Sequence, residues 1–333
     1  MVTGGAGDIG THTAVELIAA GYDVVVVDNL SNSERAAVDG VREITGAEIP
    51  FEQADCDDKA ALAGVFDKYK FNSVIHFAGL KAVGESCKIP LKYYENNIGG
   101  TVTLLEVMEK YNVKKIIFSS SATVYGTPER LPLDENCRLS TTNPYGSTKL
   151  MLEGIMQDVY KADNGWNVIL LRYFNPVGAH ESGLIGEDPK GIPNNLMPYV
   201  AQVASGKLSC IQVYGNDYDT PDGTGVRDYI HVVDLALGHI AAIEYCREPG
   251  VHIYNLGTGH GYSVLDMIHA FEKACGKALP YKICPRRPGD IAACYACPDK
   301  AEKELHWKAK YGIEEMCASQ WKWQSMNPNG YEK

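Results

Sequence analysis

Short apolar runs alternate with longer segments of helical periodicity along the first half of the chain. A short apolar run bounded by turn residues is typical of a buried strand, whereas apolar residues repeated roughly every 3.6 positions indicate a helix with one buried face. Strands are predicted at residues 1–2, 22–28, 50–54, 73–77, 114–118 and 167–173, and helices at 11–20, 34–45, 59–70, 91–111 (interrupted at 99–100) and 144–163. This alternation predicts an α/β fold with a doubly wound parallel sheet and right-handed crossovers.

The pattern becomes irregular after residue 177. Short helices are predicted at 195–205, 232–245, 265–275 and 313–323, and short strands at 210–214 and 253–256. A chain of 333 residues exceeds the size that one core usually organises. We therefore expect a large domain over residues 1–175, to which the chain returns at about 226–260, and a smaller mixed α/β domain that takes most of residues 176–333.

A glycine-rich loop follows the first predicted strand. Gly4, Gly7 and Gly10 let the backbone turn sharply and approach a pyrophosphate, which the N-terminus of the next helix can hold. The following strand ends at Asp28, 18 residues after Gly10 (28 − 10), near the spacing of an acid that binds the adenosine ribose and repels a 2′-phosphate. The larger domain is therefore predicted to be a Rossmann domain that binds NAD rather than NADP. Asp8 also lies in this loop, and we expect its side chain to point to solvent.

Several residues fall at the carboxyl ends of predicted strands, where ligands gather in open parallel sheets. They are Asp55, residues 77–79 and residues 119–121. Their shared position predicts that they face one crevice, over which the smaller domain would bind a substrate.

Tyr145 and Lys149 stand four residues apart on a predicted helix, behind Asn143 as a possible N-cap and Pro144 in the first turn. Positions i and i+4 share one face of a helix, so the phenol and the ammonium point the same way. A nearby positive charge lowers the phenol pKa from its usual value near ~10, which would give a general base close to neutral pH. The polar segment 119–126 is either a turn that leaves a strand or the source of a serine partner, Ser121.

Composition excludes several classes of partner. The net charge of −11 and pI near 5.3 argue against nucleic acid and anionic membranes, so local basic groups or backbone amides must hold any anionic ligand. Arg227, Arg286 and Arg287 are candidate basic groups, although a single surface arginine is usually just solvated. Ten irregularly spaced cysteines and no signal-peptide pattern predict reduced thiols in the cytoplasm. A lone C-x-x-C at 294–297 lacks a second ligand pair, so no metal site is expected. No apolar run approaches the ~20 residues of a membrane span.

Together these motifs resemble the extended short-chain dehydrogenase/reductase family, and within it the UDP-sugar 4-epimerases, from one end of the chain to the other. The resemblance rests on residues 3–10, 28–33, 76–86, 119–126, 145 with 149, 171–180, 191–199, 223–231 and 286–290. It implies an isomerase that interconverts UDP-glucose and UDP-galactose by reversible NAD-dependent oxidation at sugar C4. It also implies a homodimer formed through a helix pair of the larger domain.

The resemblance implies a role for each of three residues. Tyr145 would remove the proton from the sugar 4-hydroxyl while hydride leaves C4, Lys149 would lower the phenol pKa and bind the nicotinamide ribose, and Ser121 would hydrogen-bond the 4-oxygen. The 4-ketose would then swing about its pyrophosphate tether. Return of hydride and proton to the other face inverts C4 with no net redox change.

The same resemblance implies two sets of binding residues. The NAD site would comprise Gly4, Gly7, Asp8, Ile9, Gly10, Asp28, Asn29, Leu30, Asn32, Ser33, Asp55, Cys56, Phe77, Ala78, Gly79, Lys81, Asn96, Ser119, Tyr145, Lys149 and Phe174. The nucleotide-sugar site would comprise Lys81, Ser121, Tyr145, Asn175, Asn195, Leu196, Gln212, Val213, Tyr214, Arg227, Arg287, Asp290 and Cys294. Asp8 replaces the aromatic residue that is usual at its position in the family.

Cys294 lies four residues after Asp290, where this family has either a tyrosine or a smaller residue. The smaller residue leaves room for a 2-acetamido group, so UDP-GlcNAc and UDP-GalNAc are expected as further substrates. The alternative is that Cys294 is simply packed in the interior.

Two other functions fit parts of the sequence. A nucleotide-sugar 4,6-dehydratase needs an acid and a base, typically a Thr-Asp-Glu run near Ser121, but residues 121–123 contain no carboxylate. A non-catalytic NAD-sensing regulator would tend to lose the tyrosine, whereas this chain keeps Tyr145 with Lys149.

Overall fold

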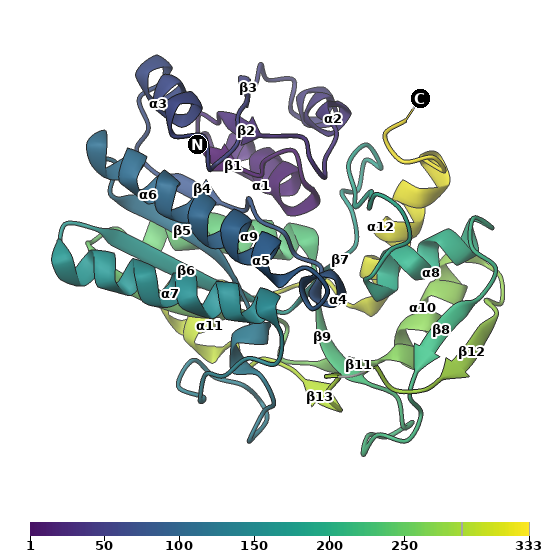
Figure 1. Cartoon of the computed structure of the whole chain (residues 1–333). Helices are drawn as coiled ribbons and strands as arrows, with labels where there is room; N and C mark the ends of the chain where they lie inside the picture. The colour runs from purple at the N-terminus through teal and green to yellow at the C-terminus, as the bar shows by residue number, and fades with distance from the viewer. Residues whose placement is uncertain (288, 333) are drawn as a thin grey trace.

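The computed structural model describes residues 1–287 and 289–332, so Pro288 of the 286–290 motif lies outside the described residues. Its centre is a seven-stranded sheet in the order β10-β6-β5-β4-β1-β2-β3, in which every strand pairing is parallel (Figure 1). The strands are β1 (Val2–Thr3), β2 (Val26–Asp28), β3 (Phe51–Gln53), β4 (Val74–His76), β5 (Lys115–Ser121), β6 (Asn167–Tyr173) and β10 (Gly250–Leu256). The predicted α/β fold class is therefore confirmed.

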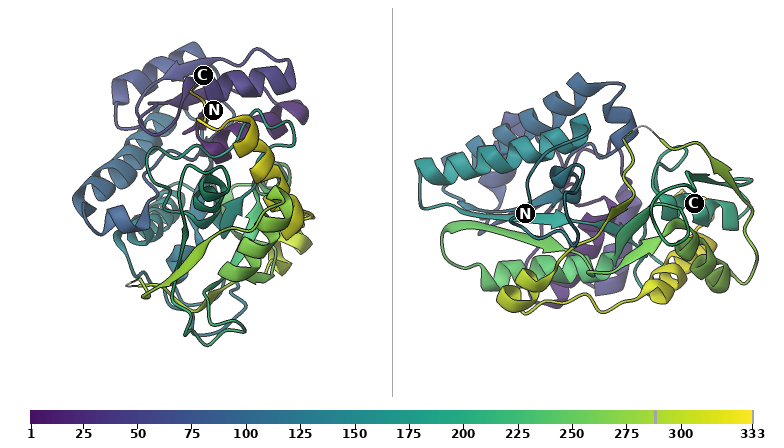
Figure 2. Two further views of the ribbon diagram at one scale, coloured as in Figure 1. Left: turned by 90° about the vertical axis from the view of Figure 1, so that its right-hand side faces the viewer. Right: turned by 90° about the horizontal axis from the view of Figure 1, so that it is seen from below.

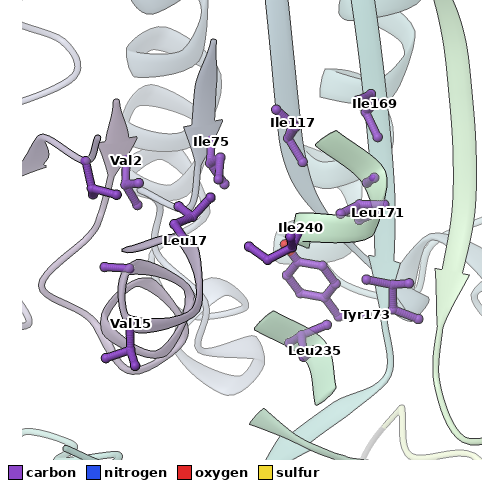
Figure 3. Close-up of a cluster of buried hydrophobic side chains, with 14 of the residues drawn as sticks. Val2, Val15, Leu17, Ile75, Ile117, Ile169, Leu171, Tyr173, Leu235 and Ile240 are labelled. Atoms are coloured by element: carbon purple, nitrogen blue, oxygen red, sulfur yellow. The ribbon is translucent and has the colours of Figure 1, made fainter. Parts of the chain in front are cut away.

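Helices cover both faces of this sheet. One face carries α1 (Asp8–Ala19), α2 (Arg35–Thr45), α9 (Val232–Tyr245) and α11 (Asp299–Leu305), and the other carries α3 (Lys59–Lys68), α6 (Gly100–Lys110) and α7 (Pro144–Ala162). Strand side chains alternate between the two cores, so that Ile117 packs with the first group of helices while Ile116 and Phe118 pack with the second. Figure 3 shows the first core, in which Leu17 of α1 and Leu235 of α9 lie near the strand residues.

The helix that carries Tyr145 and Lys149 begins where its capping signals predict. The Asn143 side chain accepts a hydrogen bond from the backbone N–H of Gly146 at 2.8 Å, and Pro144 occupies the first turn of α7. Local sequence is therefore sufficient to start this helix at the right residue.

Two predicted elements have different extents in the structure. β5 continues to Ser121 because it pairs with β6 as far as Ser121 opposite Tyr173, so residues 119–121 belong to the strand and the turn η2 (Ala122–Tyr125) follows. The predicted interruption of the 91–111 helix at its glycines is wrong. The chain passes from α5 (Pro90–Tyr94) through a π-helical turn η1 (Glu95–Gly99) directly into α6, because a π turn absorbs an extra residue without breaking the helix.

The remaining elements lie to one side of the large sheet (Figures 1 and 2). They are α8 (Leu196–Ala204), α10 (Val264–Cys275), α12 (Ile313–Met326), the pair β8 (Ile211–Tyr214) and β12 (Tyr281–Cys284), and a small sheet of β7 (Asn175–Val177), β9 (Val226–His231), β11 (Gly261–Ser263) and β13 (Ala293–Cys294). A third buried cluster joins α8, α10 and α12. Between β9 and β11 the chain returns to the large sheet to form α9 and β10. The division into two domains at residue 175 stays a prediction.

A short helix α4 (Val83–Ser86) precedes α5 and packs against α7. No helix among residues 1–287 and 289–332 is both long and apolar enough to span a membrane.

Candidate active site

A crevice lies where the strand order of the large sheet reverses, between β1 and β4. Loops that leave the carboxyl ends of two strands diverge at such a point, which makes it the usual ligand site of a doubly wound sheet. Residues predicted to bind a dinucleotide gather there: Gly4, Gly7, Asp8, Ile9, Gly10, Asp28, Asn29, Asn32, Ser33, Asp55, Cys56, Phe77, Ala78, Gly79, Lys81 and Asn96. Five predicted cofactor residues do not line this crevice, namely Leu30, Ser119, Tyr145, Lys149 and Phe174.

Glycine is required at two positions of the phosphate loop. Gly4 has φ +65°, and a Cβ there would lie 2.6 Å from the backbone N of Ala78. A Cβ on Gly10 would lie 2.5 Å from the carbonyl O of Gly4. The loop therefore packs closely against the segment after β4, and Gly7, the N-cap of α1, lines the crevice without a side chain.

The residues present fit a dinucleotide. Among the described residues no side chain caps α1, so its first N–H groups have no side-chain acceptor at the crevice and are available to an anion. At the end of β2 the buried carboxylate of Asp28 accepts the backbone N–H of Ala6 at 3.0 Å, that of Leu30 at 2.9 Å and the Ser33 hydroxyl at 2.8 Å. These contacts fix a carboxylate at the place expected for the adenosine ribose.

The three predicted catalytic residues come from neighbouring elements. Ser121 ends β5 and accepts hydrogen bonds from the backbone N–H and hydroxyl of Thr123, while Tyr145 and Lys149 share one face of α7. Lys149 is buried, and its Nζ donates to the carbonyl O of Ser119 at 2.7 Å. That Nζ also lies 5.9 Å from the centroid of the Tyr145 ring.

The electrostatics of this group differ from the sequence-based expectation. Burial raises the pKa of Tyr145, and only the Ser121 hydroxyl and Lys81 act in the opposite direction. Burial also lowers the pKa of Lys149 to about 7. Lys81 is the cation that lowers the phenol pKa in this structure, whereas Lys149 is desolvated and bonded to Ser119. The effect of Lys149 on the phenol pKa stays a prediction.

A buried ion pair anchors the end of β5 to α7 and β6. Arg172 and Glu153, both 1% exposed, are joined through Nε–Oε1 at 2.9 Å and Nη2–Oε2 at 2.7 Å. Ser120 donates to the same carboxylate. Arg172 also donates to the Tyr125 hydroxyl at 3.0 Å, which in turn donates to Asn255 of β10 at 2.7 Å. This network holds the strand end that carries Ser119 and Ser121.

The predicted sugar-nucleotide residues lie on the smaller sheets and nearby loops. The Arg287 guanidinium lies 4.8 Å from the centroid of the Tyr214 ring and 2.9 Å from Asp290. Arg227 of β9 is opposite Cys294 of β13 in the strand pairing. Tyr214 and Arg227 thus come from one part of the chain, and Arg287 and Cys294 come from another part that is far from it in sequence.

The other predicted sugar-nucleotide residues take different positions. Asn175 is exposed at the start of β7, Asn195 precedes Leu196 at the N-terminus of α8, and Gln212 accepts the Tyr214 hydroxyl at 2.7 Å. Val213 is an exception, since its side chain is buried in the third core cluster and only its backbone can face a ligand.

The prediction that the Asp8 side chain points to solvent is wrong. Its side chain is 12% exposed, and its Oδ1 is buried with no hydrogen-bond partner in the described structure. Burial and the nearby Glu187 raise the pKa of Asp8 to about 8, while Lys81 acts in the opposite direction. The Asp8 side chain shares the crevice with a loop at residues 187–189, which accounts for its burial.

That loop carries the site residue that sequence reasoning missed. Glu187 lies 2.9 Å from Lys81 Nζ and accepts a hydrogen bond from Asn195 at 3.4 Å. Glu187 lies in a stretch without helical or strand periodicity, so no local sequence pattern predicts that it belongs to the site. Among the described residues, no group of three or more His, Cys, Asp or Glu side chains has a geometry that could hold a metal ion.

Comparison with known proteins agrees with this geometry. A family model described as GDP-mannose 4,6 dehydratase matches residues 1–320. The chain is 64% identical over 333 residues to the UDP-glucose 4-epimerase of Bacillus subtilis (strain 168), a match that covers 100% of this chain and 98% of that protein. It is 57% identical over 339 residues to the UDP-glucose 4-epimerase of Homo sapiens, with 99% and 97% covered.

Solved structures give the same result. The UDP-glucose 4-epimerase of Bifidobacterium longum, crystallised in complex with NAD+ and UDP, is 62% identical with a TM-score of 0.97, and the match covers 99% of this chain and 98% of that chain. Identity over the whole length and agreement in fold lead to one conclusion: the chain belongs to the UDP-glucose 4-epimerase family of extended short-chain dehydrogenases/reductases.

Proposed function

We propose that this protein is an NAD-dependent isomerase that interconverts UDP-glucose and UDP-galactose at sugar C4. The observation that carries the proposal is the placement of Ser121 and Tyr145 on β5 and α7, next to a crevice whose residues fit a dinucleotide. The relative from Bifidobacterium longum, which was crystallised with NAD+ and UDP, supports the same ligands here.

In this reaction the chain's own residues move and hold protons. Tyr145 accepts the proton of the 4-hydroxyl as C4 is oxidised, and it returns the proton when C4 is reduced on its other face. Ser121 donates a hydrogen bond to the 4-oxygen and keeps it close to the phenol. NAD, when bound, supplies the reversible oxidant for C4, so the net redox change is zero.

Lys149 acts as a positioning group in this scheme. Its bond to the Ser119 carbonyl ties α7 to the end of β5, which sets the position of the Tyr145 ring relative to Ser121. Lys81, which lowers the pKa of Tyr145, contributes the positive charge that favours the phenolate.

The diphosphate of the substrate needs cations that the net charge of −11 does not provide. Arg227 and Arg287 offer guanidinium groups for it, and Tyr214 offers a ring beside Arg287. Both arginines keep donors free for this role, because Arg227 uses Nη1 on its own strand and Arg287 uses Nε on Asp290.

The test is incubation of the purified protein with UDP-galactose in the absence of added reductant. Formation of UDP-glucose supports the proposal. A 4-keto-6-deoxy sugar would identify a dehydratase instead, and no product would favour a non-catalytic NAD-binding regulator. The Ser121→Ala variant should lose most of the turnover, which would show that the activity comes from this site and not from a contaminating enzyme.

We extend the proposal to the N-acetylated sugars UDP-GlcNAc and UDP-GalNAc. Cys294 is 8% exposed and packs with Val124, Leu133 and Phe174, in the cluster that includes the turn after Ser121. A cysteine is much smaller than a tyrosine, so this wall leaves more room for an acetamido group at sugar C2.

We also propose a homodimer in the cytoplasm. Leu91 is 81% exposed on α5 and Met151 is 49% exposed on α7, which contacts α5, and exposed apolar side chains on neighbouring helices suit a self-complementary contact. All ten cysteines are free, which suits a reducing compartment. Analytical ultracentrifugation tests the dimer: Leu91→Asp should dissociate it, whereas a wild-type monomer would contradict the proposal.

A further inference from the structure

Asp8 occupies an unusual position for a carboxyl group. It is the first residue of α1, at the end of the glycine-rich loop, and it lines the crevice. Its Oδ1 has no hydrogen-bond partner among residues 1–287 and 289–332, and His12 Nδ1 on the same helix lies 3.4 Å away. That histidine is buried with a pKa of about 3, so it carries no charge to balance an aspartate.

The groups that face Asp8 come from three other segments. Glu187 presents a second carboxyl group from the loop over the crevice, and Lys81 presents an ammonium from the segment after β4. Lys81 is engaged by Glu187 at 2.9 Å. Tyr331, near the C-terminus, is the third neighbour, and its pKa is raised by burial and by Asp8. One lysine therefore serves two carboxyl groups.

The second carboxyl group cannot easily move away from the crevice. Trp323 of α12 donates to the carbonyl O of Glu187 at 3.3 Å, and the backbone N–H of Tyr331 donates to Asp188 at 2.9 Å. A Cβ on Gly186 would lie 2.4 Å from the Trp323 ring, so the loop is packed tightly against α12. The repulsion between Glu187 and an ionised Asp8 is thus built into the fold.

We propose that Asp8 is compatible with the pyrophosphate of the dinucleotide only as a neutral carboxylic acid, so that retention of the cofactor is linked to one proton. This rests on the proposed function, since it concerns the NAD that the function requires. As a neutral acid Asp8 can donate a hydrogen bond to a phosphate oxygen. As a carboxylate it adds a like charge beside the pyrophosphate and Glu187, and Lys81, the cation that acts on it in the described part of the chain, is already paired with Glu187.

The sign of the pH dependence follows from linkage. The pKa of Asp8 is about 8 in the protein, and a nearby pyrophosphate raises it further because like charges disfavour ionisation. Binding therefore takes up a proton at pH values above about 8 and below the pKa of the complex. In that window the dissociation constant of the dinucleotide rises with pH, by up to roughly tenfold per pH unit.

The experiment is a fluorescence titration with NADH between pH 6.5 and 9.5 on three proteins: wild type, Asp8→Asn and Glu187→Gln. Asp8→Asn keeps the shape of the side chain without a titratable proton, and it retains every other titrating group of the site, Lys149 and Tyr145 included. For wild type the dissociation constant should rise by about fivefold between pH 8 and 9, whereas for Asp8→Asn it should stay nearly constant. For Glu187→Gln the rise should begin at lower pH, because the repulsion that favours the neutral acid is gone.

The possible outcomes separate the two proposals. Parallel curves for wild type and Asp8→Asn overturn the proton linkage and leave the proposed function intact. Failure of all three proteins to bind NADH at pH 6.5 overturns the proposed function, and the linkage with it. A curve for Glu187→Gln that shifts to higher pH also overturns the linkage, because it reverses the sign of the interaction between the two carboxyl groups.

Discussion

Lys149 Nζ donates to the backbone carbonyl of Ser119 at 2.7 Å and lies 5.9 Å from the centroid of the Tyr145 ring. The lysine is thus anchored to the strand end while its ammonium lies over the phenol ring. The charge that lowers the pKa of Tyr145 comes instead from Lys81, whose ammonium is 2.9 Å from Glu187.

Tyr145→Phe should reduce turnover of UDP-galactose by about 10²- to 10⁴-fold while NAD remains bound, because the substitution removes the proton acceptor and keeps the ring. Steady-state rates and the ultraviolet spectrum of the purified variant measure the two effects. A near-normal rate would assign the base to another residue.

Lys81→Met should move the acidic limb of the pH–rate profile to higher pH. Removing the cation raises the pKa of Tyr145, so the phenolate forms only in more alkaline solution and the rate at neutral pH falls. Lys81→Arg is the matched control, since it keeps the positive charge. An acidic limb that stays in place in Lys81→Met would show that this lysine does not act on the phenol.

Cys294→Tyr should lower turnover of UDP-GalNAc by roughly 10²-fold or more and leave turnover of UDP-galactose largely unchanged, because a tyrosine ring fills the space of the acetamido group. Cys294→Ser tests whether the thiol itself matters and should retain both activities. Equal loss on both sugars would instead indicate that Cys294 is a packing residue.

Glu153→Gln or Arg172→Met should each lower the free energy of unfolding by about 3–5 kcal/mol, because each leaves a buried, unpaired charged partner. The double variant with methionine at both positions should cost less than either single change, since no lone charge remains. Urea unfolding of the three variants gives the comparison. Simple additivity would mean that the two side chains contribute independently.

Asp8→Asn should stabilise the protein without cofactor at pH 7, by about 2–4 kcal/mol. A raised carboxyl pKa means that the folded state binds the proton more tightly than the unfolded state, whose pKa is 3.8, so wild-type stability falls as pH rises from about 4 toward 8. Thermal melting from pH 5 to pH 8 should show a gap between variant and wild type that widens with pH. A gap of constant size would mean that the aspartate is not buried as a neutral acid.

The sequence predicted the elements whose signals are local. Asn143 and Pro144 mark the start of α7, and residues 167–173 form β6 as predicted, because a capping side chain and a continuous apolar run act within a few residues. The phosphate loop was also predictable from local signals. Gly4 needs a left-handed backbone at its own position, and Asp28 sits at the end of its own strand.

Features set by pairing between distant segments could not be predicted in this way. The extension of β5 to Ser121 depends on its register with β6, and the strand β9 joins β11 and β13 rather than the large sheet. Neither the register of β5 nor the pairing of β9 can be read from the residues of that strand, because the same apolar strand can pair with several neighbours.

The fold class, the phosphate loop and the spacing of Tyr145 and Lys149 could all be predicted from the sequence, because helix and strand periodicity and backbone freedom are properties of neighbouring residues. The charge that each titratable group meets depends instead on tertiary contacts. Asp8 lies next to Glu187, and Lys149 bonds to Ser119, since burial and electrostatics depend on what the folded chain brings into contact.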